Sequence, residues 1–172
     1  MSVFPSPPQK SLWIVAQGND MRGDDALGPL LIDRLQQRSM LAKDIDQQWD
    51  FQFCPEHALR FPDYDCILLV DASTAIDKPF CLSRVLPDEK KASISHSLSP
   101  SELSSVYIKH VAKKGSPGPL IWQLEIKAYQ FELGTGLSLQ AKRNLESAWD
   151  YLYAILQQYR YFMAFYALIR CH

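Results

Sequence analysis

This sequence of 172 residues lacks two features that would point to large charged or lipid partners. It has no basic surplus, because 18 lysines and arginines stand against 19 aspartates and glutamates, a formal net charge of -1. A nucleic-acid-binding protein usually carries such a surplus, so we expect no nucleic acid as a partner. The longest apolar run, Tyr161 to Ile169, falls well short of the ~20 residues that a membrane span needs, so we expect no membrane partner.

The chain also has few cysteines and no recognisable targeting segment. Its four cysteines form no CxxC pair and no spacing typical of a metal site. Three of them lie in apolar runs that resemble strands, which predicts buried, reduced thiols. The first eleven residues, MSVFPSPPQKS, contain three prolines and no apolar stretch, which is typical of a flexible leader and not of a signal peptide. We therefore expect a cytoplasmic protein.

Strand-like and helix-like segments alternate along the rest of the chain, whose 47% hydrophobic content is that of a folded domain. Apolar runs predict strands over residues 11–17, 49–53, 66–70, 80–85 and 120–126. Helical periodicity and capping signals predict helices from residue 26, over 55–61, from 99 toward 112, and from 138 onward. This order predicts a single α/β domain over residues 12–172, with residues 1–11 as a proline-rich leader. We expect a mainly parallel, twisted sheet of about five strands with helices on both faces, similar to a phosphorylase/hydrolase-like sandwich, and an extended C-terminal helix.

The glycine-rich segment from Gly18 to Gly28, GNDMRGDDALG, follows the first predicted strand. It matches neither GxGxxG nor GxxxxGK[ST], and the adjacent carboxylates of Asp24 and Asp25 would repel phosphate, so a nucleotide loop is disfavoured. One of the two aspartates has a simple explanation as a helix cap. A carboxylate on a rigid turn is also a good ligand for a divalent cation.

Two further residues lie where chemistry is expected. Asp71 ends the apolar run CILLVDA and would reach the carboxyl edge of the sheet, although aspartate is also a common turn residue there. His96 lies on a connection that leads into a helix, whereas His57, His110 and His172 are interpreted as packed or solvent-facing. An imidazole and two carboxylates suit either a divalent metal or an acid–base pair, and spacing alone does not choose between them.

Three fragments taken together, GNDMRGDDALG, LLVDAS and SHSLSPSEL, resemble the hydrogenase maturation proteases. The segment LEIKAYQFELGTGLS (124–138) fits the strand, turn and final helix of that family, so the resemblance runs from residue 12 to about 155. It implies an endopeptidase that removes the C-terminal extension of a nickel–iron hydrogenase large-subunit precursor after nickel insertion. The precursor is then the expected partner, and the enzyme is expected to be a monomer.

The resemblance also implies the site residues. Asp25, Asp71 and His96 correspond to the family's metal ligands, with Asp25 and Asp71 as catalytic residues of an aspartate- or metal-dependent peptidase. Asp25 is preferred to Asp24 because it directly precedes the position where the family usually has glycine, here Ala26. The implied metal is nickel supplied by the substrate, and no stably bound cofactor is expected.

Other interpretations remain open. A non-catalytic, metal-sensing assembly chaperone on the same scaffold is the main alternative, and a nucleotide-binding α/β module is disfavoured by the acidic loop. The aromatic segment YRYFMAFYALIRCH (159–172) has no clear family counterpart. It is interpreted as an extension of the last helix that packs on the core, or otherwise as a docking patch for the partner.

Overall fold

The computed structural model describes residues 12–38, 45–87, 98–112 and 118–170, with the side chains of the last helix described as far as residue 158. Strands and helices alternate in the order that the sequence predicts. The strands are β1 (Leu12–Gln17), β2 (Ile45–Asp50), β3 (Cys66–Ser73), β4 (Phe80–Arg84) and β5 (Leu120–Lys127). The helices are α1 (Leu27–Gln36), α2 (Pro55–Arg60), α3 (Pro100–Val106) and α4 (Leu139–Arg170), with 3₁₀ turns at Gly23–Ala26 and Phe61–Asp63 and a π turn at Tyr107–Val111.

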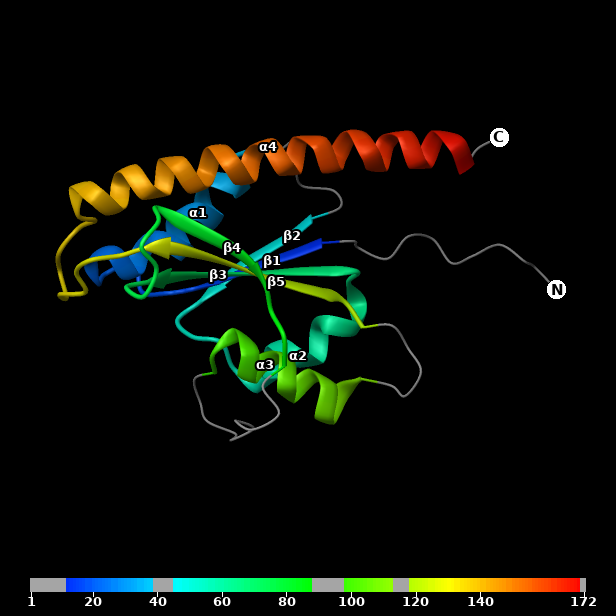
Figure 1. Ribbon diagram of the computed structural model, residues 1–172, viewed down its shortest axis with the longest axis horizontal. Helices are drawn as coiled ribbons and strands as arrows, with labels where there is room; N and C mark the ends of the chain where they lie inside the picture. Colours follow the sequence, from blue (N-terminus) through cyan, green and yellow to red (C-terminus); the bar gives the residue numbers. More distant parts are fainter. Residues whose placement is uncertain (1–11, 39–44, 88–97, 113–117, 171–172) are drawn as a thin grey trace.

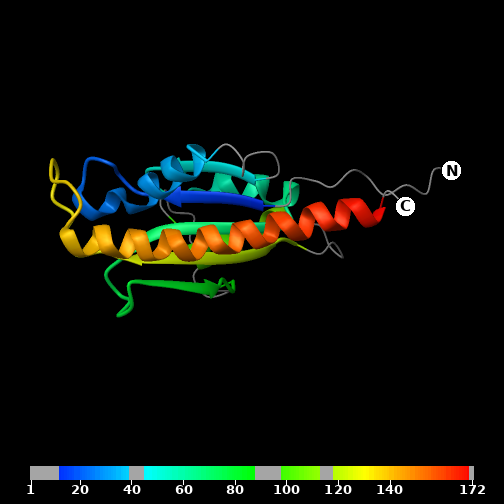
Figure 2. The same ribbon diagram turned by 90° about the horizontal axis from the view of Figure 1, so that it is seen from above.

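The five strands form one sheet in the order β2-β1-β3-β5-β4. Strands β2, β1, β3 and β5 are parallel, and only β4 runs antiparallel to its neighbour β5. Helices α1 and α4 cover one face of the sheet, and α2 and α3 cover the other (Figures 1 and 2). The predicted fold class is confirmed: an α/β sandwich around a mainly parallel sheet of five strands.

The strand order reverses between β1 and β3. The chain leaves β1 through α1 to β2 on one side, then returns through α2 to β3 on the other side of β1. At such a point the connections leave on opposite faces, and open α/β sheets bind their ligands in the crevice at the carboxyl ends of the two strands. The glycine-rich segment follows β1, and Asp71 lies near the end of β3, so both belong to this edge.

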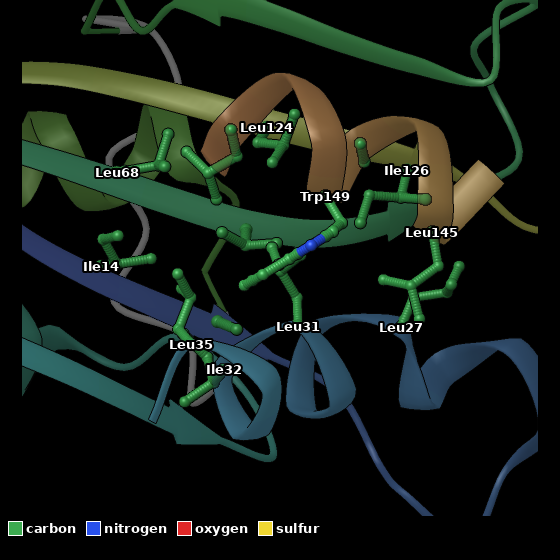
Figure 3. Packing of buried hydrophobic residues seen from close by; sticks show 14 of the residues in the cluster. Ile14, Leu27, Leu31, Ile32, Leu35, Leu68, Leu124, Ile126, Leu145 and Trp149 are labelled. Atoms are coloured by element: carbon green, nitrogen blue, oxygen red, sulfur yellow. The ribbon is translucent and has the colours of Figure 1, made fainter. Parts of the chain in front are cut away.

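Successive residues of the central strands serve two separate cores. Ile14 and Val70 belong to the cluster beneath α1 and α4, whereas Val15 and Leu69 belong to the cluster beneath α2 and α3. Figure 3 shows the first cluster, where Trp149 of α4 packs between the sheet and α1. Burial on both faces explains why β1 and β3 read as continuous apolar runs instead of alternating ones.

The second predicted strand differs in position from the one in the structure. The second strand was expected over residues 49–53 but runs from Ile45 to Asp50. The prediction followed the aromatic residues, yet β2 is an edge strand in which Ile45 alone is buried and the other residues are partly exposed, so its sequence is polar. Phe53, by contrast, is fully buried after the strand, in the turn that leads into α2.

The cysteines also differ from expectation. Cys54, Cys66 and Cys81 are free thiols, as predicted, but each is only partly buried. Cys54 is not on a strand: it is the residue that precedes α2. Cys171 lies outside the described residues, as does the predicted leader over residues 1–11.

Helix α4 is the longest element, with 32 residues, or about 48 Å at 1.5 Å per residue. Its C-terminal turns continue past the ends of the strands (Figure 1). The sequence-based expectation of an extended last helix is met, while the packing of its side chains beyond residue 158 lies outside the described part. No helix in the described ranges combines the length and apolar character needed to cross a membrane.

Candidate functional site at the carboxyl edge of the sheet

The loop after β1 folds back tightly on itself. Gly18 has a φ of 147°, and a Cβ there would lie 2.1 Å from the carbonyl oxygen of Asp25. The Gly18 amide donates to the carbonyl oxygen of Asp50 at 3.0 Å, which ties the loop to the end of β2. Only glycine allows this approach, so the glycine fixes where Asp25 lies.

Asp24 and Asp25 have different environments. Asp24 is fully buried, and its carboxylate accepts four hydrogen bonds. The donors are the Tyr129 and Gln130 amides and, from Ser138, both the amide and the hydroxyl, at 2.7–3.2 Å. Asp24 therefore joins the first loop to the segment between β5 and α4. It does not cap its own helix, which corrects the simple explanation offered from the sequence.

Asp25 retains more freedom to bind a ligand. Its Oδ2 atom accepts a hydrogen bond from the Asn19 amide at 3.1 Å, and the side chain is partly buried. Burial raises the pKa of the Asp25 carboxyl, and the Asn19 amide and the Arg22 charge act in the opposite direction. Compared with Asp24, it is the carboxylate with unused acceptor capacity.

Asp71 lies two residues before the end of β3, in register with Glu125 of β5. Burial raises the pKa of its carboxyl from 3.8 to about 7, while hydrogen bonds from the Gln17 side chain and the Ala72 amide oppose that shift. The negative charges of Asp25 and Glu125 contribute to this rise in the pKa of Asp71. The carboxylates of Asp25 and Asp71 therefore influence each other at this edge of the sheet, and their roles as ligands or catalytic residues stay predictions.

Gln17, the last residue of β1, was not predicted from the sequence to be a site residue. Its Oε1 atom accepts a hydrogen bond from the Phe53 amide at 3.0 Å, which leaves its amino group to donate to the Asp71 carboxylate. Its orientation is therefore fixed from one side by the β2–α2 turn. The only signal in the sequence was a polar residue at the end of an otherwise apolar strand.

A second polar cluster adjoins the same turn. His57 is buried between the rings of Trp13 and Phe53, as its interpretation as a packed residue predicted. Its Nδ1 atom accepts from the Cys54 amide at 3.0 Å and lies 3.1 Å from the Cys54 thiol, while Nε2 lies 3.3 Å from Asp50. Because Nδ1 accepts from an amide, the ring proton belongs on Nε2, where it can be donated to Asp50. These contacts stabilise the β2–α2 turn, and the Phe53 amide of that turn fixes the orientation of the Gln17 side chain.

The third predicted ligand, His96, lies outside the described residues. The chain is described again from Leu98, whose amide donates to the carbonyl oxygen of Phe53 at 2.9 Å. Within the described ranges, no three histidine, cysteine, aspartate or glutamate side chains converge as a metal site. The structure therefore brings together Asp25 and Asp71, and the role of His96 stays a prediction.

Comparison with known proteins finds similarity among solved structures and none in sequence families or curated proteins. No protein-family model matches the sequence, and no curated protein matches it. Among solved structures, an endopeptidase from Escherichia coli has a TM-score of 0.65 at 17% identity, and the NiFe hydrogenase maturation protease HycI from Thermococcus kodakarensis has 0.62 at 22%. The hydrogenase maturating endopeptidase HybD from E. coli has a TM-score of 0.60 at 17% identity. Each of these alignments covers 86% of this chain and 93% of the other, so the chain shares the fold of these endopeptidases over 86% of its length.

Proposed function

We propose that this chain is a hydrogenase maturation protease, an endopeptidase that removes the C-terminal extension of a nickel–iron hydrogenase large-subunit precursor after nickel insertion. The observation that carries the proposal is the pair Asp25 and Asp71. Two partly buried carboxylates, one from the loop after β1 and one from the end of β3, influence each other at the β1–β3 reversal point, in a fold shared with maturation proteases. Perturbed carboxyl groups in such a crevice are typical of functional sites.

Asp25, Asp71 and His96 are the proposed ligands for the nickel of the substrate. Two carboxylates and an imidazole form a donor set that suits a divalent first-row metal. Leu98, two residues after His96 in the sequence, donates its amide to the carbonyl oxygen of Phe53 in the β2–α2 turn, which favours His96 as the third ligand. Nickel arrives with the substrate, and the enzyme needs no stably bound cofactor of its own.

Asp25 and Asp71 are also the proposed catalytic residues. A carboxyl group with a pKa of about 7 both accepts and releases a proton near neutral pH, so Asp71 is suited to take the proton of an attacking water. Direct attack by a carboxylate is the other route. The amino group of Gln17 keeps Asp71 oriented in either case. The nickel of the bound precursor would polarise the peptide carbonyl or the water.

The same electrostatics explain why an empty precursor should be a poor substrate. Asp25 and Glu125 both disfavour the charged form of Asp71, so the site carries unfavourable negative charge when no cation is present. A precursor that carries nickel neutralises this charge, and a nickel-free precursor does not. We therefore expect cleavage only after metal loading.

The test is the intact mass of the large-subunit precursor from the same cell after incubation with the chain. Nickel-loaded precursor is incubated with wild type, with Asp71→Asn and with Asp33→Asn, and nickel-free precursor with wild type. Asp33 is an exposed residue of α1, so Asp33→Asn controls for the loss of one carboxylate. We expect loss of a C-terminal peptide with wild type and Asp33→Asn, and only from the loaded precursor.

Two other results would change the assignment. An unchanged mass in every sample, with a complex still formed, would favour the non-catalytic assembly chaperone. Cleavage by Asp71→Asn at the wild-type rate would remove Asp71 from the catalytic residues.

The remaining features of the proposal follow from composition. A net charge of -1 shows no basic surplus of the kind that nucleic-acid binders carry, so the precursor and not a nucleic acid is the proposed partner. We propose a cytoplasmic monomer, and size-exclusion chromatography with light scattering would test the oligomeric state.

A further inference from the structure

Among the strands that the structure describes, none pairs with the outer edge of β4. Strands β2 and β4 form the two edges of the sheet, and within the described ranges β4 pairs only with β5. Figure 2 shows β4 as the outermost strand on its side of the molecule, with α4 crossing over its inner neighbours. An edge strand offers backbone donors and acceptors to any extended chain that can approach it.

The register identifies which backbone groups point outward. The Lys127 amide donates to the carbonyl oxygen of Pro79, and the Val85 amide donates to that of Ile121. In an antiparallel pair, groups that face the partner recur at every second residue, so the odd-numbered residues of β4 face β5. The N–H and C=O groups of Phe80, Leu82 and Arg84 therefore face outward.

Within the described ranges, the strand at the opposite edge of the sheet carries more charged residues than β4. Arg60 donates to the β2 side chains of Gln48 at 2.8 Å and Asp46 at 3.4 Å, so that edge strand carries an ion pair. Charged side chains are a common protection against pairing with another chain. The β4 sequence, FCLSR, contains no proline and has its one charge at the last residue.

Helix α4 provides an apolar surface beside this edge. The Phe80 ring contacts the Tyr151 ring with centroids 5.1 Å apart, and Phe80 and Leu82 pack against the cluster beneath α4. Tyr151 is 45% exposed, and Ile155, one helical turn further, is 36% exposed. A strand added outside Phe80 would direct every second side chain toward these two residues.

We propose that the outer edge of β4 binds an extended peptide by strand addition, and that this peptide is the C-terminal extension of the precursor. The backbone of Phe80, Leu82 and Arg84 supplies the hydrogen bonds, and Tyr151 and Ile155 select apolar side chains at alternate positions of the peptide. This assignment rests on the proposed peptidase function, for which it names the surface that recognises the tail.

The edge lies within reach of the candidate site. Asp71, Glu125 and Cys81 are in register across β3, β5 and β4, so an added strand would lie three strand spacings from Asp71. At about 4.8 Å per spacing this is about 14 Å, a distance that roughly four extended residues cover. A tail bound at β4 can therefore be continuous with a peptide bond at Asp71.

Backbone amide exchange, measured by NMR on the full chain with Asp71→Asn so that the extension is not removed, tests the proposal. The probes are the nickel-loaded precursor with its extension and the same subunit without it. We expect at least tenfold slower exchange at Phe80, Leu82 and Arg84 with the extended precursor only. The amides of Cys81 and Ser83, which already face β5, should change little and serve as internal controls.

A backbone substitution provides the second measurement. Leu82→Pro removes an outward N–H and no hydrogen bond to β5, and proline is tolerated on an edge strand. Leu82→Ala keeps the N–H and shortens the same side chain. We expect at least a tenfold loss of affinity for a synthetic peptide of the extension with Leu82→Pro, and a smaller loss with Leu82→Ala. If Leu82→Pro does not fold, extension peptides N-methylated at successive residues replace it, and their affinities should alternate with a period of two.

Three outcomes would overturn the proposal. Cleavage by wild type with unchanged exchange at β4 would show that the tail binds elsewhere, while the peptidase function stands. Protection that depends on the concentration of this chain alone would show that a second copy covers the edge. Equal effects of Leu82→Pro and Leu82→Ala would point to the side chain and not to strand addition. Failure of the peptidase function is separate, since wild type would then cut no precursor.

Discussion

At the residue scale, the two neighbouring aspartates of the first loop are expected to differ in their effect on stability: Asp24 stabilises the folded state, whereas Asp25 does not. The carboxylate of Asp24 is buried and accepts four hydrogen bonds, whereas Asp25 accepts one amide and is disfavoured by burial. Functional groups often reduce stability, because a site that awaits a ligand keeps polar groups partly unsatisfied. The difference leads to a matched pair of substitutions.

Asp24→Asn should reduce the free energy of unfolding by about 3 kcal/mol, because an amide group presents hydrogens to donors that now meet a carboxylate. Asp25→Asn should change it by less than about 1 kcal/mol. Urea denaturation of both variants beside wild type measures the difference. Similar losses for the two would contradict the division of roles.

Asp71 should make the free energy of unfolding depend on pH. Its pKa is about 7 in the folded chain against 3.8 for an ordinary aspartate, so the folded state binds this proton more tightly than the unfolded state. The stability that comes from the bound proton is complete below about pH 4 and is lost as the pH rises through about 7. Asp71→Asn is neutral throughout, so its stability relative to wild type should increase between pH 4 and pH 8.

The size of this change is on the order of 2–3 kcal/mol, less than the full shift implies because Asp71 retains contact with water. Thermal or urea unfolding at several pH values measures it, with Asp33→Asn as the control for an exposed carboxyl. Parallel stability curves for wild type and Asp71→Asn would contradict the raised pKa.

At the element scale, local signals with a defined geometry predicted the structure best. The capping box at α3 is present as expected: the Glu102 amide donates to Ser99 Oγ at 3.3 Å, and the Ser99 amide donates to the Glu102 carboxylate at 2.8 Å. The start of β2 was missed because an edge strand needs little burial, and Asp46 and Gln48 read as loop residues. Gln17 was missed because its role depends on Phe53, which is distant in sequence.

The capping box allows a direct measurement at this scale. Ser99→Ala removes the acceptor of the Glu102 amide and should lower the free energy of unfolding by about 1 kcal/mol. Ser99→Thr, which keeps a hydroxyl that accepts from the Glu102 amide and donates to the Glu102 carboxylate, should restore most of this loss. Urea denaturation of the three proteins tests the effect, and an equal loss with Ser99→Thr would show that the hydroxyl does not act as a cap.

At the scale of the whole molecule, the position of the site follows from topology. Apolar runs and helix periodicity predict a parallel sheet, and a parallel sheet brings its carboxyl ends to one edge, so Asp25 and Asp71 could be assigned to one neighbourhood before any coordinates. Which of two adjacent acids faces the crevice could not be predicted from local pattern. It depends on the segment between β5 and α4, more than 100 residues further along the chain, whose amides donate hydrogen bonds to the Asp24 carboxylate.

The length of α4 leads to the last prediction. The last residue of the helix in the described hydrophobic core is Leu156, and Figure 1 shows its C-terminal turns continuing past the strands. A chain that ends at Gln158 keeps every core residue of α4 that the structure describes, so its free energy of unfolding should lie within about 1 kcal/mol of the full chain. Cleavage of the loaded precursor should continue as well. A loss of several kcal/mol would instead show that residues 159–172 pack on the domain, whereas normal stability with lost precursor binding would make this segment a docking patch.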